Sequence, residues 1–246
     1  MVSLNDTRVR FYRHLKYAIT RPDPPSSSAP LEGPVVVVGS APISNKPVGF
    51  DQSFHIISIN GSQSVIEAWG VEAPHTTFMM FNQIRGTNLN ACEVRRVLSG
   101  RRTGELHLLL WRDGRQALED GLRAFDYRYD HLNIINRYQR MALLDRVCWL
   151  RTAELAREGK CSNGINAVLF AIHNKAPAVI ITGINPKANG HIYNQANLPR
   201  FHSDMDATIL EKLVERRYPL FTADEEVAPA TGLPLWRGEI PLKRPG

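Results

Sequence analysis

The chain has 246 residues, of which 43% are hydrophobic and 22% charged, a composition that supports a folded core and excludes bulk disorder. This length fits one large α/β domain, because single cores grow to about 250 residues before they split. The formal net charge of +6 suits an anionic partner. The basic residues are scattered, with no recognisable nucleic-acid module, so we expect no nucleic-acid partner.

Cysteine usage and hydropathy indicate the compartment. Cys92, Cys148 and Cys161 stand at wide spacings without a CxxC pair, so neither a disulfide framework nor a structural zinc site is predicted. No apolar run reaches the roughly 18 residues of a membrane span, and the N-terminus lacks the apolar core of a signal peptide. We therefore expect a cytoplasmic protein.

The N-terminal region separates from the rest by composition. Residues 8–21 predict a basic helix, with Val9, Tyr12, Leu15 and Ile19 near one face. Two interpretations stay open: the helix packs on its own domain, or it lies peripherally on the anionic surface of the inner membrane. The Pro/Ser-rich stretch that follows suits a flexible or extended linker.

Strand and helix patterns alternate after residue 33. Strands are expected at 34–38, 55–59, 76–81, 106–111 and 178–182, and helices at 63–70, 91–103, 115–124, from Asp130 to about 150, from Ser162 for about a dozen residues, and after His202. The first strand, PVVVV, is typical of the centre of a parallel sheet, where helices cover both faces. The alternation predicts a doubly wound, mostly parallel, Rossmann-like sheet with flanking helices.

Small and polar residues follow several of these strands. Gly39, Ser40 and Ala41 begin the turn after the first strand, and Asn60 follows the second. In open α/β sheets the ligand crevice lies at the carboxyl ends of the strands, and small residues let the backbone approach a phosphate or ribose. An ordinary turn explains each motif alone equally well.

The stretch 161–206 concentrates the unusual residues. Ser162, Asn163 and Gly164 open a helix, whose free N–H groups could bind a phosphate or carboxylate, or could simply be capped. The later strand ends in a Gly/Asn-rich loop that begins with Gly183, Ile184 and Asn185.

That loop also supplies polar side chains that could act as a lid. Lys187 and Tyr193 are candidates for gripping an anionic group from it.

His202 is the candidate general base, because histidine accepts a proton near neutral pH and a carboxylate one turn away could orient it. A capping or packing role is the alternative. Asp204 and Asp206 form a DxD triplet, a pattern that can hold a divalent metal, but here it opens a helix, where Asp stabilises the macrodipole. We predict no metal site. HExxH, Walker and GxSxG motifs do not occur, which argues against zinc proteases, P-loop NTPases and α/β-hydrolases.

In this order, the motifs GSAPIS (39–44), Asn60, SNG (162–164), GINPKANGHIY (183–193) and His202 followed by acids resemble those of the small bacterial sialyltransferases that modify lipooligosaccharide. The resemblance spans roughly 34–70 and 160–225. It implies an inverting, metal-independent glycosyltransferase with no tightly bound cofactor, which moves a sugar acid from a CMP-sugar to a glycan acceptor in lipopolysaccharide or capsule biosynthesis. It also implies a single α/β nucleotide-sugar-binding domain, 34–246, with a lid at about 185–201, after a helix and linker at 1–33.

The resemblance assigns roles by position. The residues that would contact CMP are Ser40, Asn60, Ser162, Asn163, Gly164, Gly183, Ile184 and Asn185. Tyr193 would hold the leaving phosphate and His202 would be the general base. Hydrogen bonds must stabilise the departing phosphate where no metal does so, and the acceptor hydroxyl must lose a proton as it attacks.

The sequence departs from the family pattern at four positions. Ser40 stands in place of Asn, Ala41 in place of Gly, Asn185 in place of an acid, and Lys187 in place of a second phosphate-binding Tyr. Lys187 could replace that Tyr by charge. The departures leave the donor open among sialic acid, Kdo and related nonulosonic acids.

Two other functions are compatible with the motifs. A pterin diphosphokinase has a similar Gly-Pro-Ser turn and would bind ATP and Mg²⁺ through carboxylates such as Asp204 and Asp206. A non-catalytic nucleotide- or glycan-binding module would result if the departures have removed activity. The sequence leaves the oligomeric state open and is compatible with a homo-oligomer.

Overall fold

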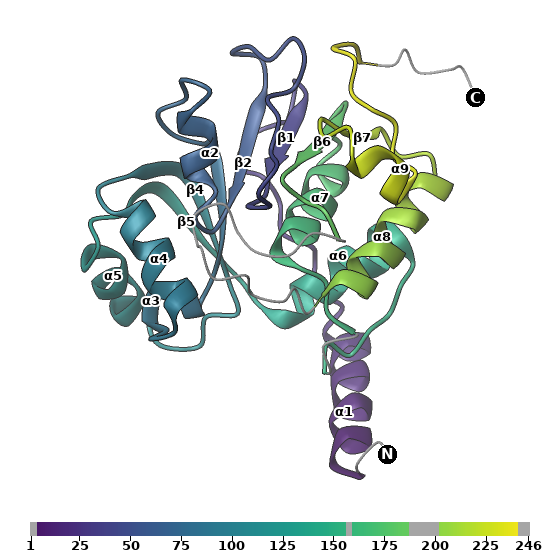
Figure 1. Cartoon of the computed structure of the whole chain (residues 1–246). Coiled ribbons are helices and arrows are strands. Elements are labelled where there is room, and N and C mark those ends of the chain that lie inside the picture. Colours follow the sequence, from purple (N-terminus) through teal and green to yellow (C-terminus); the bar gives the residue numbers. More distant parts are fainter. Residues whose placement is uncertain (1–3, 156–158, 187–201, 241–246) are drawn as a thin grey trace.

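The computed structural model describes residues 4–155, 159–186 and 202–240 (Figure 1). Its strands are β1 (Val35–Val38), β2 (His55–Ile59), β3 (Thr76–Met80), β4 (Arg102–Leu109), β5 (Arg128–Ile135), β6 (Val179–Thr182) and β7 (Leu220–Thr222). Its helices are α1 (Leu4–Thr20), α2 (Gln63–Glu67), α3 (Asn82–Arg85), α4 (Leu89–Leu98), α5 (Arg115–Arg123), α6 (Arg137–Cys148), α7 (Asn163–His173), α8 (Ser203–Glu215) and α9 (Val227–Thr231).

The seven strands form one sheet in the order β5-β4-β3-β2-β1-β6-β7, and every pairing is parallel. The chain runs outward from β1 to β5, then returns through α6 and α7 to β6 on the other side of β1. The strand order therefore reverses at β1, and in such sheets the ligand crevice lies outside the carboxyl ends of the strands at that point. The predicted doubly wound parallel sheet is confirmed.

The side chains of β1 alternate between cores on the two faces of the sheet. Val35 and Val37 belong to the core formed with α6, α7 and α8, whereas Val36 and Val38 belong to a core that includes residues of α2 and Trp236. All four valines are buried because helices cover both faces. The valine run thus fixes β1 in the middle of the sheet, between β2 and β6.

Several of the predicted boundaries are wrong. The helix expected after Asp130 forms but starts only at Arg137, because β5 occupies Arg128–Ile135. Ile135 is the only buried residue of β5, so this edge strand carries no apolar alternation that the sequence could show. The helix expected at 91–103 ends at Leu98, since Gly100 has a φ of +74°, and β4 begins at Arg102 instead of 106. The short elements α3, β7 and α9 were not predicted.

The N-terminal helix forms, but it stands away from the body of the molecule (Figure 1). None of its residues is buried, so its apolar side does not pack on its own domain. No helix in the described ranges is long and apolar enough to cross a membrane. The following linker is extended and attached: the Ser27 and Ser28 N–H groups donate to Asn174 Oδ1 and Glu105 Oε1, each at 2.9 Å.

A histidine pair lies at the amino-terminal side of the sheet. The rings of His55 and His75 stack with centroids 4.8 Å apart, and His55 Nε2 lies 3.0 Å from Thr76 Oγ1. Burial, with a smaller effect of His75, lowers the pKa of His55 to about 4. The folded protein therefore holds His55 neutral at pH values where the unfolded chain would bind a proton.

This arrangement predicts a loss of stability in mild acid. The stability that neutral His55 contributes is complete above the unfolded pKa of about 6.5 and is lost as pH falls toward 4. We expect a His55→Gln variant, which keeps a partner for Thr76, to lose about 2 kcal/mol less unfolding free energy over this range than the wild type. Urea unfolding at pH 6.5 and 4.5 measures the difference, and equal pH slopes would contradict the assignment.

Candidate functional site at the strand-order reversal

The turns after β1 and β6 are in close backbone contact. The Gly39 N–H donates to the Thr182 carbonyl at 2.8 Å, and the Ala41 N–H donates to the Gly183 carbonyl at 2.9 Å. A Cβ atom on Gly39 would lie 2.2 Å from the Gly183 oxygen, so no side chain fits there. Gly183 has a φ of +62°, and a Cβ on it would lie 2.3 Å from Ser44 Oγ. Both glycines are required by this approach.

Ile184 joins these turns to the start of α7. Ile184 is 6% exposed, and its side chain packs against two glycines. A Cβ atom added to Gly39 would lie 2.6 Å from Ile184 Cγ1, and one added to Gly164 would lie 3.0 Å from Ile184 Cδ1. The structure therefore brings Gly39, Gly164, Gly183 and Ile184 together, as the motifs predicted. The Ile184 side chain packs between two glycines, so a CMP contact of this residue would come from its backbone, and that role stays a prediction.

The N-terminus of α7 is held from several sides. Ser162 is the N-cap, and its Oγ accepts from the Ile165 N–H at 3.3 Å. The Ser162 N–H donates to Asp206 Oδ1 at 2.8 Å. Buried Arg140 donates to Asn166 Oδ1 (3.2 Å) and to the Cys161 carbonyl (3.1 Å). These contacts fix the position of the helix end and its partial positive charge.

Two N–H groups of this helix end remain outside the helix's own bonding pattern. Asn163 and Gly164 are its first two residues, and first-turn N–H groups have no intrahelical acceptor. The Ser162 N–H already donates to Asp206, and the Ile165 N–H already donates to the Ser162 side chain. The N–H groups of Asn163 and Gly164 are therefore the two donors that an anion would meet.

Asp204 and Asp206 lie on different sides of α8. Asp206 is 7% exposed and accepts from Ser162, whereas Asp204 is exposed. Two carboxylates arranged in this way do not converge on one ion. Among the described residues, no group of three or more His, Cys, Asp or Glu side chains could hold a metal.

His202 occupies the N-cap position of α8, and its carbonyl accepts from the Asp206 N–H at 2.9 Å. Asp206 in turn accepts from the Ser162 N–H, 44 residues away in sequence. Asp206 therefore connects the candidate base, His202, to the candidate anion site at the α7 N-terminus. The carboxylate one turn after His202 thus binds the α7 N-terminus, and its expected role in orienting His202 stays a prediction.

Asn60 follows β2 in the left-handed conformation, with a φ of +50°. Its Oδ1 accepts from the Met80 N–H at 3.0 Å. Ser62 Oγ donates to the Val38 carbonyl at 2.6 Å and accepts from the Ile59 N–H at 2.7 Å. These bonds join the ends of β1, β2 and β3, so Asn60 lies at the predicted edge with its Oδ1 already engaged.

The remaining predicted residues divide into two groups. Ser40 and Asn185 lie partly exposed on the turns after β1 and β6. Lys187, Tyr193 and most of the predicted lid lie outside the described residues, so their roles stay predictions.

Asp224 is a residue of this edge that the sequence reading missed. Its carboxylate, 1% exposed, accepts from the Gly183 N–H (2.7 Å), the Asn45 N–H (2.9 Å), Asn45 Nδ2 (3.1 Å) and Thr182 Oγ1 (3.0 Å). Burial raises its pKa, and these hydrogen bonds act in the opposite direction. A signal was present, since Asp224 closely follows the short apolar run Leu220–Thr222, which has the pattern of the other strand ends.

We expect Asp224→Asn to destabilise this edge, because an NH₂ group would face backbone and side-chain donors. Losing charged acceptors from buried donors should lower the unfolding free energy by about 2–3 kcal/mol, measured by urea unfolding. Glu225→Gln is the matched control, because it makes the same chemical change at the adjacent exposed residue. Equal stability of the two variants would contradict the role given to Asp224.

Comparisons with known proteins place the fold. No protein-family model matches the chain, and no curated protein sequence matches it. Among solved structures, the monofunctional α-2,3-sialyltransferase Cst-I from Campylobacter jejuni matches with a TM-score of 0.55 and 10% identity, covering 89% of this chain and 87% of that one. The sialyltransferase CST-II with a trisaccharide acceptor and CMP matches with a TM-score of 0.55 and 13% identity, over 85% and 88% of the two chains.

A third match is CstII from Campylobacter jejuni with the substrate analogue CMP, with a TM-score of 0.53 and 11% identity, over 83% of this chain and 85% of that one. Three matches that each cover most of both chains agree with the parallel sheet described above. The chain therefore has the fold of these bacterial sialyltransferases.

Proposed function

We propose that this protein is a glycosyltransferase that uses a CMP-activated sugar acid as donor and a glycan as acceptor. The observation that carries the proposal is the convergence of the β1 turn, the β6 turn and the α7 N-terminus at the strand-order reversal. The fold is shared with sialyltransferases whose structures contain CMP, a CMP-sugar analogue or a trisaccharide acceptor, which supports a cytidine nucleotide in the proposed donor.

In this proposal the α7 N-terminus receives the negative charge of the donor. The N–H groups of Asn163 and Gly164 donate to a phosphate oxygen, and the helix dipole adds a partial positive charge. Gly39 and Gly183 let the turns after β1 and β6 approach each other closely, which places both turns beside this helix end. Lys187 and Tyr193 are assigned, from their sequence positions alone, to the leaving phosphate.

His202 is proposed to accept the proton of the acceptor hydroxyl as that oxygen bonds to the anomeric carbon and the bond to the CMP phosphate breaks. The proposed transfer is inverting because it is one displacement, with the hydroxyl attacking opposite the departing CMP. The His202 carbonyl accepts from the Asp206 N–H, and the Asp206 carboxylate accepts from the Ser162 N–H. This connection supports the role, because Asp206 then fixes the proposed base relative to the donor site. Metal independence, the division at residue 33 and the lid at about 185–201 are parts of the same proposal.

The diphosphokinase alternative is disfavoured by the carboxylates it requires. It needs Asp204 and Asp206 on one Mg²⁺ ion, but Asp206 is committed to Ser162 and Asp204 is exposed on α8. The non-catalytic alternative differs from the proposal in turnover and not in binding, so an activity measurement separates the two.

The anion site can be tested by removing one N–H group. Proline is compatible with the first position of a helix, and Ser162, with a φ of −66° and a ψ of 168°, has a conformation that proline allows before it. We expect Asn163→Pro to weaken CMP binding about tenfold relative to Asn163→Ala, which keeps the N–H, with similar stability.

Isothermal titration calorimetry with CMP, CDP and ATP with Mg²⁺ measures both variants and the wild type. Equal CMP affinities of the two variants would exclude the Asn163 N–H as a hydrogen-bond donor to CMP. A wild type that binds ATP with Mg²⁺ but neither cytidine nucleotide would overturn the proposed donor.

The base role can be tested separately. We expect His202→Ala to lower the rate of CMP release from a CMP-sugar about 10²- to 10⁴-fold while leaving CMP affinity unchanged, because a general base acts on the acceptor and not on the nucleotide. Full turnover in His202→Ala would remove His202 from the mechanism. A wild type that binds CMP but turns over no CMP-sugar would favour the non-catalytic module.

A further inference from the structure

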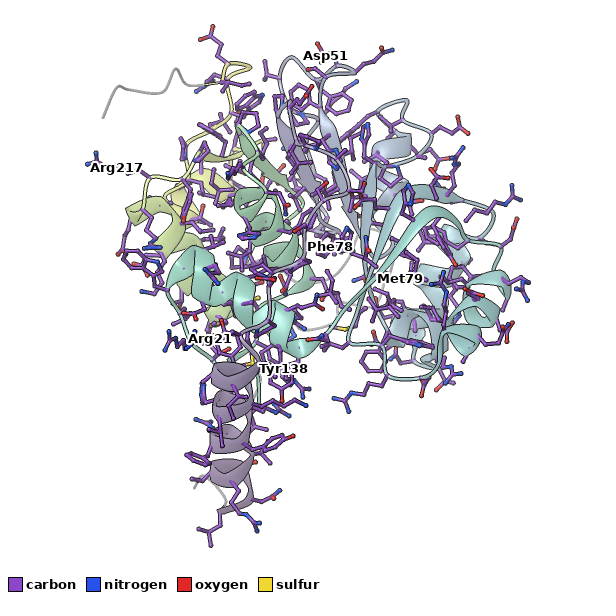
Figure 2. All side chains as sticks on the ribbon, turned by 180° about the vertical axis from the view of Figure 1, so that it is seen from behind. Arg21, Asp51, Phe78, Met79, Tyr138 and Arg217 are labelled. Carbon is purple, nitrogen blue, oxygen red and sulfur yellow. The ribbon has the colours of Figure 1, made fainter. Side chains whose placement is uncertain are left out.

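Helix α1 carries an apolar stripe that the rest of the described chain leaves uncovered. Leu4, Phe11, Leu15 and Ile19 are exposed by 87%, 69%, 47% and 72%. At about 100° per residue these four side chains fall within a sector of roughly 80°. The outer turns of α1 stand clear of the sheet and its helices (Figures 1 and 2). The stripe is therefore a continuous surface and not a set of scattered residues.

The opposite side of α1 is attached to the body. Arg13 Nη1 donates to the carbonyls of Ala153 (2.9 Å) and Glu154 (2.8 Å), and Tyr17 Oη donates to Asp145 Oδ2 at 2.9 Å. Lys16 Nζ lies 5.2 Å from the ring centre of Tyr138, which Figure 2 shows at the body end of the helix. Arg13 is roughly 160° around the helix from Leu15, so the attachment points the stripe away from the body.

The charge on the helix fits an anionic surface. Its 17 residues contain four cations, Arg8, Arg10, Arg13 and Lys16, and one carboxylate, Asp6, which gives a net charge of +3. Arg8 lies within the apolar sector, where its long stem can pack along the stripe while the guanidinium reaches outward. Basic residues beside Phe and Leu are typical of helices that lie in a membrane interface.

The same residues do not form a seam for a second copy of the helix. A coiled coil needs apolar residues at both core positions of each heptad. With Leu4 and Phe11 at one core position, the other falls either on Thr7 and His14 or on Arg8 and Leu15. Either register puts a polar or charged side chain into the seam, which disfavours a coiled coil. A helix at a membrane interface has no such seam, so these side chains do not disfavour it.

We propose that α1 anchors the protein to an anionic phospholipid bilayer, with Leu4, Phe11, Leu15 and Ile19 inserted at the interface and the flanking cations on the headgroups. The bonds from Arg13 and Tyr17 then transmit the anchored position to the body through Ala153, Glu154 and Asp145. This anchor needs no nucleotide, so it stands or fails independently of the CMP-sugar proposal.

Co-sedimentation of the full chain with phosphatidylcholine vesicles, with and without phosphatidylglycerol, tests the anchor. We expect at least tenfold stronger binding to the anionic vesicles, and at least a tenfold loss in Leu15→Glu. Thr20→Glu is the matched control, because it adds the same charge to the same helix outside the apolar sector, and its binding should fall less than threefold. All changed residues are exposed, and circular dichroism checks that each variant is folded.

Two results would overturn the anchor: equal binding to both vesicle types, or equal losses in Leu15→Glu and Thr20→Glu. Light scattering without lipid measures the oligomeric state, and so tests whether a second copy of the chain covers the stripe. A wild-type oligomer that Leu15→Glu converts to a monomer, together with no vesicle binding, would assign the stripe to a second copy of the chain. CMP titration of the same samples reports the nucleotide site separately.

Discussion

The close approach of Gly39 to Gly183 is the constraint on which the rest of the site depends. The two backbones meet because β1 pairs with β6 on one side and β2 on the other, and both turns leave the same edge of the sheet. Any side chain at either glycine would separate them. Asp224 secures the contact by accepting from the Gly183 N–H and Thr182 while also holding Asn45. A buried carboxylate with four donors is a specific fixing point, because each donor would be costly to leave unpaired.

A second connection joins this edge to the helices behind it. Asp206 links α8 to the Ser162 N–H, and Arg140 links α6 to Asn166 and Cys161. The α7 N-terminus is thus set by side chains from two other helices, while Ile184 packs it against the glycines of the turns. This rigidity matters for the proposed chemistry, since donors that are already in place need no reorganisation when a phosphate leaves.

The proposed membrane anchor gives the N-terminal region a role that complements the site. Helix α1 has no buried residue, so its apolar side chains contribute little to the stability of the fold. Its attachment through Arg13 and Tyr17 nevertheless keeps it in one orientation. A helix that is held on one side and bare on the other is suited to placing the body of the protein against a bilayer surface, as the proposed anchor requires.

The sequence by itself determined the features that depend on local pattern. The buried valines of β1, the helix that opens at 162–164 and the strand that ends at Thr182 were all predicted, because burial on both faces, polar residues at a helix start and β-branched runs leave direct traces in neighbouring residues. Only the tertiary structure decided the long-range contacts. β5 was misread because an edge strand is stabilised by its partner β4 and needs no apolar alternation. The roles of Asp206 and Asp224 depend on donors about 40 residues away, and nothing in the local pattern specifies which backbone N–H groups a carboxylate will meet.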